Sequence, residues 1–294
     1  MGRSISQTTE GGFSAISSTY NPSGVFGSGV VFPCTASFAF VVPADVTAVR
    51  VRCFGGGGGG ANEYSSGGDG GTSSFGAYVS ATGGTGGKGR SYSGQVHLGG
   101  TGSGGDINFT GGSGKSTSSS PSSQPGGGVA SYFGNGGHAA IPASNTNTSG
   151  GDGYGGAGGG GSISTSGGQT TGGSGFMSAG SVQRNAYSTT PATFVPAQHP
   201  IGQGWSVDMY GTGGGGVSSL RGINGGGGGA ISAGSFPGGG SGGLYGGGAG
   251  GGFAMLTITG LISGNSINVT VGAGGYGGSN TVPSGSHGLV VIEY

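Results

Sequence analysis

The stretch VRVRCFGGGGGG, residues 49–60, joins the two patterns that decide the fold. Its first half alternates apolar residues with arginine, as a half-buried β-strand does. Its second half is an unbroken glycine run, residues 55–60. Glycine has no side chain to bury and loses more backbone freedom on folding than any other residue. Such a run must therefore either stay disordered or pack backbone against backbone.

The composition of the whole chain favours the ordered alternative. Glycine accounts for 86 of the 294 residues, and further runs lie at 213–216 and 225–229. Hydrophobic residues make up 31% of the chain and aromatic residues 9%, but only 5% is charged. A disordered linker usually carries more charge and fewer apolar residues. Collagen is excluded, because glycine does not recur at every third position and the chain has only 11 prolines.

The ordered form that suits these glycines is a bundle of polyproline-II helices. This helix has about three residues per turn and no internal hydrogen bonds, so faces without side chains let neighbouring backbones approach and bond to one another. Segments such as 67–71 (GGDGG) and 83–89 (GGTGGKG) offer two small faces and one outward side chain. We expect the all-glycine runs to form interior helices.

Strand patterns lie near both ends of the chain. Alternating apolar residues at 38–42 and 49–53 flank a turn at 43–45, which predicts two antiparallel strands with one apolar face. Three more strands are expected at 253–259, 266–271 and 289–294. The predicted fold is mainly β: a small β-sandwich built from both ends of the chain, with an inserted glycine-rich polyproline-II bundle and essentially no α-helix.

This fold divides the chain into four expected parts. Residues 1–30 form an N-terminal attachment segment, and 31–80 supply the first strands of the sandwich. Residues 81–250 form the glycine-rich bundle with protruding loops, and 251–294 supply the closing strands. The sandwich anchors the bundle, because glycine packing alone gains little from the hydrophobic effect.

Two cysteines have the parity of the apolar strand face. Cys34 and Cys53 are almost symmetric about Pro43, so they could be neighbours across the predicted strand pair. They either form a disulfide, if the chain meets an oxidising medium, or serve as two small buried hydrophobes.

Charge and motifs exclude several functions. The net charge is zero, and the basic residues form no large cluster. The alternation of Arg50 and Arg52 along a strand is best interpreted as a solvated face, so nucleic acid is not expected as a partner. The many GxGxxG matches have no helix after them, and no catalytic triad, carboxylate pair or metal-ligand spacing is present. We expect no enzyme, cofactor or metal. We also expect no signal peptide and no membrane span, because the polar start MGRSIS has no apolar core segment and the chain has no long apolar run.

Aromatic residues that interrupt the glycine tracts are the candidate binding residues. Each either caps the bundle as part of a small hydrophobic cluster or stands exposed as a contact residue. The longest interruption, 184–210, combines aromatic and polar side chains, and long loops between ordered elements are often functional. The candidates are Tyr187, Phe194, His199, Trp205, Tyr210, Tyr92, His97, Tyr132 and Phe133.

Three stretches together resemble the glycine-rich tail-fibre and receptor-binding proteins of tailed bacteriophages. Residues 38–52 followed by a glycine run are similar to that family's opening strands. Residues 70–84 are similar to its second element. Residues 268–275, with the ending 288–294, are similar to its closing strands. The resemblance spans about residues 36–294. In the middle of this range the general glycine-rich pattern is similar, but the individual residues do not match.

The resemblance implies an adhesin of the virion tail that recognises the host surface through loops. Its partners would be other tail proteins, bound through the N-terminal region, and a bacterial surface polysaccharide or outer-membrane protein. It would be made in the host cytoplasm and act outside, as a single chain or a homotrimer. The alternative is a purely structural tail component or glycine-rich spacer. An ice-binding or silk-like protein is disfavoured, because the irregular interruptions do not form a repeated array.

Overall fold

The computed structural model describes residues 30–92, 94–116, 124–139, 153, 156–160, 170–171, 182–183, 194–195, 227–228 and 233–294. Strands dominate its regular structure, and its one helical element is a 3-10 turn, η1 (Arg90–Tyr92). Within these ranges no helix has the length and apolar character needed to cross a membrane. The prediction of a mainly β chain without α-helix is confirmed for the described residues.

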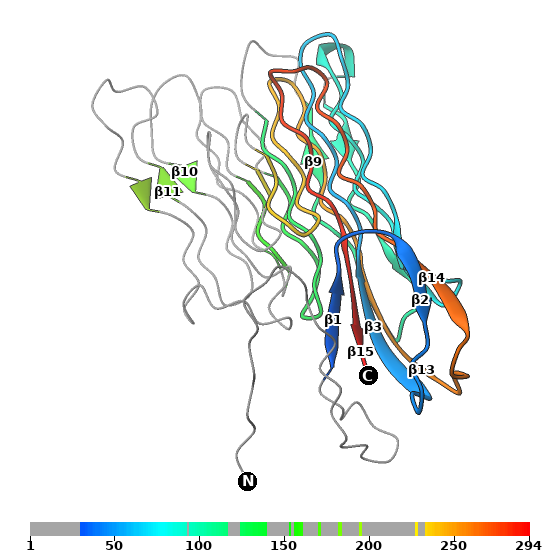
Figure 1. Ribbon diagram of the computed structural model, residues 1–294. Helices are drawn as coiled ribbons and strands as arrows, with labels where there is room; N and C mark the ends of the chain where they lie inside the picture. The colour runs from blue at the N-terminus through cyan, green and yellow to red at the C-terminus, as the bar shows by residue number, and fades with distance from the viewer. Residues whose placement is uncertain are drawn as a thin grey trace.

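Two antiparallel sheets form the sandwich at one end of the molecule (Figure 1). In the first sheet the order is β1 (Val31–Cys34), β15 (Leu289–Glu293), β3 (Ala48–Phe54), β13 (Phe253–Thr259) and β8 (Ile107–Phe109). In the second the order is β2 (Phe38–Val41), β14 (Ser266–Thr270), β4 (Ser73–Phe75), β5 (Val79–Ala81) and β7 (Gly102–Ser103). Both ends of the chain therefore contribute to each sheet, as predicted.

The core of the sandwich lies between the two sheets. Phe40 and Phe75 of the second sheet belong to one buried cluster with Val49, Val51 and Ile292 of the first. Phe40 and Phe75 contact each other with ring centroids 5.7 Å apart. Aromatic rings and branched chains of this size each contribute about 1.5–3 kcal/mol on burial, so this cluster holds the two sheets together.

The expected pairing of residues 38–42 with 49–53 is wrong. The strand β2 pairs with β14, whereas β3 lies in the other sheet between β15 and β13. The turn after β2 carries the chain across the sandwich, with Asp45 in a left-handed conformation at φ 63°. The two apolar faces therefore meet face to face instead of lying side by side, and each strand takes its hydrogen-bonding partners from the C-terminal part of the chain.

The two cysteines are free and buried, and they are not neighbours. Cys34 and Cys53 both pair with Val290, from opposite sides, so β15 lies between them. Two strand spacings amount to about 9.5 Å, too far for a disulfide. Burial raises the pKa of the Cys34 thiol to about 12, and burial also raises the pKa of Cys53. Of the two alternatives, the structure shows the pair of small buried hydrophobes.

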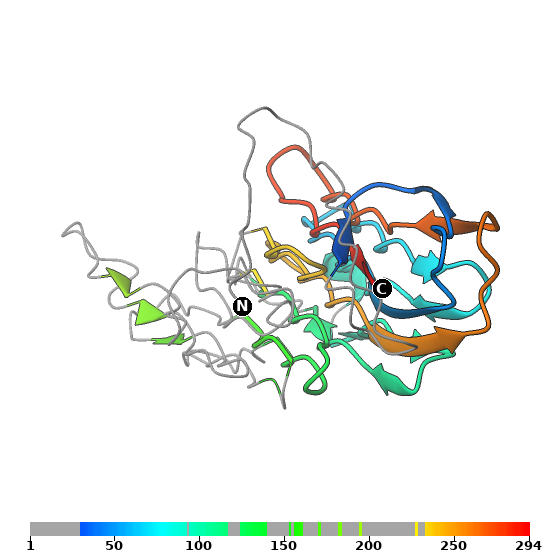
Figure 2. The same cartoon turned by 60° about the horizontal axis from the view of Figure 1, so that its bottom comes forward.

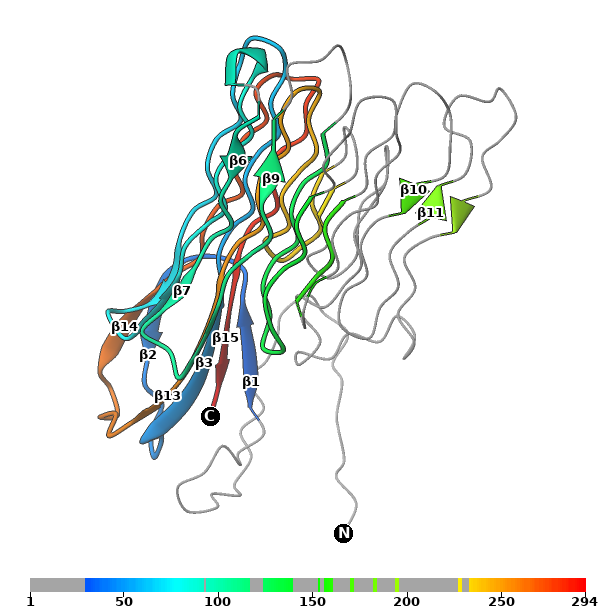
Figure 3. The same cartoon turned by 180° about the vertical axis from the view of Figure 1, so that it is seen from behind.

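The glycine-rich segments continue directly from the strands. Residue 55 follows β3, 252 precedes β13, and 288 precedes β15. These segments run on from the strand ends and form the opposite end of the molecule (Figures 1 and 2). Within the bundle, the short strands β6 (Val96–His97) and β9 (Gly114–Lys115) pair with each other in antiparallel orientation (Figure 3). A further short sheet consists of β10 (Thr170–Thr171), β11 (Val182–Gln183) and β12 (Phe194–Val195).

The glycine run 55–60 shows how the bundle is held. Its backbone N–H groups donate in three directions that recur at every third residue: 55 and 58 bond to carbonyls of the segment 249–252, 56 and 59 to 68–71, and 57 and 60 to 283–286. A repeat of three residues is that of the polyproline-II helix. The expectation of an interior helix agrees with this bonding for the run 55–60; the run 213–216, and 225–229 apart from 227–228, lie outside the described residues.

The remaining directions around the run 55–60 are closed by three further segments. A Cβ atom on any of these six glycines would lie well under 3.0 Å from backbone oxygen atoms of 82–85, 273–276 or 239–242. Glycines three positions apart in the run face the same segment, at positions that are also three residues apart. Because backbone atoms on every side leave no room for a methyl group, only glycine fits at these positions.

The expected division of the chain at residues 81 and 250 does not separate sandwich from bundle. The strands β7 and β8 lie within the expected bundle but belong to the two sheets. Conversely, 55–71 and 272–288 lie within the expected strand regions but belong to the bundle. The chain alternates repeatedly between strand and glycine helix, so no single boundary in the sequence separates the sandwich from the bundle. The expected attachment segment, 1–30, lies outside the described residues except for residue 30.

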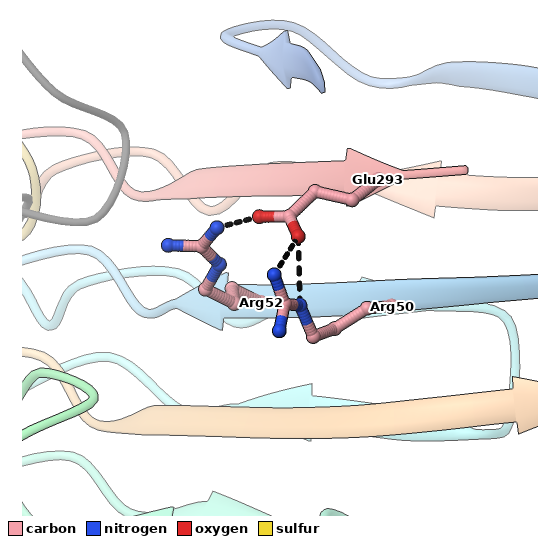
Figure 4. Close-up of polar contacts among 3 residues, drawn as sticks. All are labelled: Arg50, Arg52 and Glu293. Atoms are coloured by element: carbon pink, nitrogen blue, oxygen red, sulfur yellow. Dashed lines mark hydrogen bonds and ion pairs between the residues drawn. The ribbon is translucent and has the colours of Figure 1, made fainter. Parts of the chain in front are cut away.

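A charged cluster covers part of the outer face of the first sheet (Figure 4). Glu293 is directly opposite Arg50 in the β3–β15 register, and its carboxylate accepts from the Nε atom of Arg50 at 2.7 Å. The other carboxylate oxygen forms an ion pair with Arg52. The side chains of Arg52 and Glu293 are only 5% and 8% exposed, against 37% for Arg50. The interpretation of both arginines as a solvated face is therefore wrong for Arg52, because Glu293 compensates its charge inside the protein.

Candidate binding surface at the tip of the bundle

The end of the bundle farthest from the sandwich carries a compact turn with an exposed aromatic side chain. Asn62 follows the glycine run, and its Oδ1 atom accepts hydrogen bonds from the N–H groups of Tyr64 at 2.9 Å and Ser65 at 2.6 Å. The N–H of Asn62 donates to the carbonyl of Ser65, which closes the turn. Asparagine favours such turns because its side chain replaces a backbone acceptor. The turn leaves Tyr64 88% exposed.

An ion pair fixes the neighbouring segment beside this turn. The Nη1 atom of Arg90 lies 2.8 Å from Oε1 of Glu63, and the Arg90 N–H donates to the Glu63 carbonyl at 3.1 Å. Arg90 begins the 3-10 turn η1, which ends at Tyr92. The hydrogen bond from Arg90 holds the pKa of the Glu63 carboxyl below its ordinary value, and the hydrogen bond to Glu63 raises the pKa of Tyr64.

These residues form one surface, which we call the tip surface: Asn62, Glu63, Tyr64, Arg90 and Tyr92. Tyr92 is half exposed, and the nearly buried Tyr245 lies close enough to Tyr64 and Arg90 to influence the pKa of both. Figure 1 shows the two loops that carry this surface together at the top of the bundle. The tip surface presents two tyrosine rings beside one carboxylate and one guanidinium. Such a combination suits recognition of hydroxyl-rich or amphipathic partners.

His97 is not part of this surface. It is only 3% exposed; its Nδ1 atom lies 2.7 Å from the Gly86 carbonyl and its Nε2 atom 2.6 Å from Oγ of Ser116. The Oγ atom of Ser116 also lies 2.9 Å from the Lys88 carbonyl oxygen. A carbonyl only accepts, so Nδ1 carries the proton. The expectation that His97 contacts a receptor is therefore wrong: its ring ties three bundle segments together.

Tyr132 and Phe133 are accessible but lie at the other end of the bundle. Their rings pack edge to face, with centroids 5.2 Å apart. The N–H of Ser131 donates to the carbonyl of Gly134, which makes this segment a tight turn. The preceding residues Val129 and Ala130 are buried against Phe54 and Phe253 where the strands meet the bundle. The structure thus places Tyr92 at the tip and this aromatic pair beside the sandwich.

The other candidates cannot be placed on either surface. Tyr187, His199, Trp205 and Tyr210 lie outside the described residues. Phe194 is described only as a backbone position in β12, paired with Gln183. The segment 184–210 therefore stays a prediction.

Of the five tip residues, only Tyr92 was predicted from the sequence, although a signal for Glu63 and Tyr64 was present. The interruption ANEYSS, residues 61–66, separates two glycine tracts and contains both Glu63 and Tyr64. It is much shorter than the interruption 184–210. The pairing of Glu63 with Arg90 has no local sequence signal, because 26 residues separate the two positions.

The described residues offer no centre for metal chemistry. No group of three or more histidine, cysteine, aspartate or glutamate side chains within them is arranged to hold a metal ion. The two charged residues at the tip are paired with each other, with Arg90 exposed and Glu63 partly exposed.

Comparisons with protein-family models, curated proteins and solved structures find no match.

Proposed function

We propose that this chain is a tail-fibre or tail-tip adhesin of a tailed bacteriophage, which recognises the host bacterial surface through loops on a glycine-rich scaffold. The observation that carries the proposal is the contrast between the tip surface and the bundle behind it. The run 55–60 is enclosed by backbone on all sides, whereas Tyr64 and Tyr92 project at its far end. A stiff rod with side-chain chemistry at one end is suited to presenting a contact surface at a distance.

The partner would be a bacterial surface polysaccharide or an outer-membrane protein. Tyrosine supplies a rigid, amphipathic contact area with little loss of conformational entropy on binding. Glu63 supplies an acceptor and Arg90 a donor, and their ion pair already fixes the geometry of both. The residues 184–210 would add further contacts, and 1–30 would join other tail proteins. The chain would thus be part of the virion.

The test uses phage that carries the double substitution Tyr64→Ser and Tyr92→Ser. We expect normal incorporation into virions and a loss of adsorption of about tenfold or more, because exposed tyrosines are frequent hot spots of binding energy. The matched control is Tyr132→Ser, which removes an exposed tyrosine at the sandwich end. A second variant lacks residues 186–208 and tests the long interruption separately.

Three outcomes separate the proposals. Loss of adsorption in the double variant alone assigns the contact to the tip surface. Loss in the deletion variant alone assigns it to 184–210. Normal adsorption of both variants, with virions that adsorb equally well without the protein, would support the alternative of a purely structural spacer.

A further inference from the structure

A concave surface lies on the outer face of the second sheet, at the end of the molecule opposite to the tip surface. It is a groove of about 800 Å³ between the turn that joins β4 to β5 and the loop that joins β13 to β14. The strand β14 forms its floor, where Ser266, Asn268 and Thr270 point outward and alternate with buried residues. Its volume lies within the usual range for small-molecule sites.

The walls of the groove are preformed. On one side, the loop 260–265 is tied to the connection after β2: the N–H groups of Leu261 and Gly264 donate to the carbonyls of Thr47 and Val42, both at 2.9 Å. On the other side, the N–H of Gly76 donates to the Asn268 carbonyl at 2.7 Å, so the turn is bonded to the floor. A groove with fixed walls requires little ordering when a ligand binds.

The polar side chains of the groove are available to a ligand. Hydroxyl and amide groups line it from three sides, and none of them forms a hydrogen bond with another residue of the described chain: Ser74, Asn265, Ser266, Asn268 and Thr270. Each such group can both donate and accept. The lining contains no aspartate, glutamate, lysine, arginine or histidine.

Two exposed apolar side chains complete the groove. Tyr78, which is half exposed, contacts the core residue Phe75 with ring centroids 6.3 Å apart. Ile262 is exposed on the facing loop. A pyranose ring has the complementary surface, with hydroxyl groups around its edge and apolar C–H faces that pack against aromatic rings.

We propose that this groove is a binding site for an uncharged saccharide. The hydroxyl and amide groups of the floor would bond to sugar hydroxyls, and Tyr78 and Ile262 would cover an apolar face of the sugar. The absence of charge in the lining disfavours phosphorylated or acidic sugars, because their charge would be desolvated without a partner. This site lies at the end of the molecule opposite to the tip surface, and the inference does not depend on the proposed function.

The experiment measures binding of the intact chain to uncharged trisaccharides of glucose, galactose, mannose and N-acetylglucosamine by isothermal titration calorimetry. A sialylated trisaccharide serves as the charged counterpart. We expect at least one neutral sugar to bind with a dissociation constant of about 1 mM or tighter, and the sialylated sugar to bind at least tenfold more weakly. A soluble polymer of the same sugar is titrated per repeat unit, which distinguishes a site for chain ends from one for polysaccharide chains.

Variants assign the site. Asn268→Ala and, on the opposite wall, Ile262→Ser should each weaken binding at least tenfold while the thermal unfolding midpoint is retained. The control Ser80→Ala removes a hydroxyl on β5, outside the groove, and Tyr64→Ser removes the tip tyrosine; both should bind like the wild type. Failure of every neutral sugar to bind would overturn the proposal, as would binding that persists in both groove variants.

Discussion

The sandwich and the bundle are held together in opposite ways within one continuous chain. In the sandwich, Phe75 is fully buried against Phe40, and the identity of each side chain determines the packing. In the bundle, Gly58 donates its N–H to the Ala249 carbonyl, and its Cα faces the carbonyl of Thr85. The hydrophobic effect stabilises the first region, whereas hydrogen bonds between closely spaced backbones stabilise the second.

The difference shows why the two regions occur together. Backbone hydrogen bonds exchange for bonds to water at little net gain, so the bundle needs an element that fixes the positions of its helices. The strands supply this element, because they continue directly into the glycine segments. At the far end, the loops 61–66 and 88–92 carry side chains outward.

The largest expected effect tests the absence of side chains in the bundle. Gly58→Ala would place a methyl group against the backbone of Thr85, which cannot move aside without displacing its own neighbours. We expect a loss of more than about 4 kcal/mol in the free energy of unfolding, beyond the range of ordinary substitutions. Urea denaturation followed by circular dichroism measures it.

The matched control for this substitution is Gly264→Ala. Gly264 has a φ of 82° and open space around its Cα, so alanine there meets conformational strain but no collision. We expect a loss of only about 1 kcal/mol. Equal losses in the two variants would show that backbone packing in the bundle is looser than the structure indicates.

The second prediction removes packing from the sandwich. Phe75→Ala would leave a cavity between the two sheets and cost about 3–4 kcal/mol. Because the strands fix the positions of the glycine helices, we expect the bundle to unfold in the same transition. Amide signals of residues 49–53 for the sandwich and of residues 55–60 for the bundle measure the two midpoints. Separate midpoints would contradict the dependence of the bundle on the sandwich.

The third prediction compares two ion pairs with different burial. Glu293→Gln would leave the buried Arg52 without its carboxylate, and we expect a loss of about 2–3 kcal/mol. Glu63→Gln removes the carboxylate of an exposed pair at the tip, which water and salt already screen, and should leave the unfolding midpoint unchanged. A thermal scan of both variants decides whether burial is the cause.

The smallest expected effect concerns pH. Burial lowers the pKa of His97 below its ordinary value of 6.5. The unfolded chain therefore binds the proton at a higher pH than the folded chain, and stability falls as the pH decreases from 6.5 toward the lowered pKa. His97→Gln should be less stable at neutral pH but should lose this part of the pH dependence. An unchanged slope between wild type and variant would exclude His97 as its source.

Local patterns in the sequence were sufficient for the kinds of element but not for their partners. Alternation at 49–53 and the run 55–60 predict a strand and an interior helix, because both follow from short-range chemistry. The partners of β2 and the separation of Cys34 from Cys53 depend on β14 and β15, more than 200 residues away in the sequence. Pairing over such distances leaves no local signal.

The candidate site was predictable to a similar extent. Tyr92 was a candidate contact residue because it interrupts a glycine tract, and of the two alternatives the structure shows an exposed side chain, at the tip. His97 lies in the same interruption but is buried, since its two nitrogen atoms find a carbonyl and a hydroxyl from other segments. The sequence shows which residues are chemically distinct, and only the packing of the segments shows which of them face outward.

Hydrogen exchange at the glycine amides of residues 55–60 tests the central claim most directly. Each of these amides donates to a carbonyl of a neighbouring segment. We expect their exchange to be slowed to the same extent as that of Val51 in β3, because both regions would open only in global unfolding. Exchange of these amides at the rate of an unstructured glycine peptide, while Val51 stays protected, would contradict the account of a bundle held by its backbone.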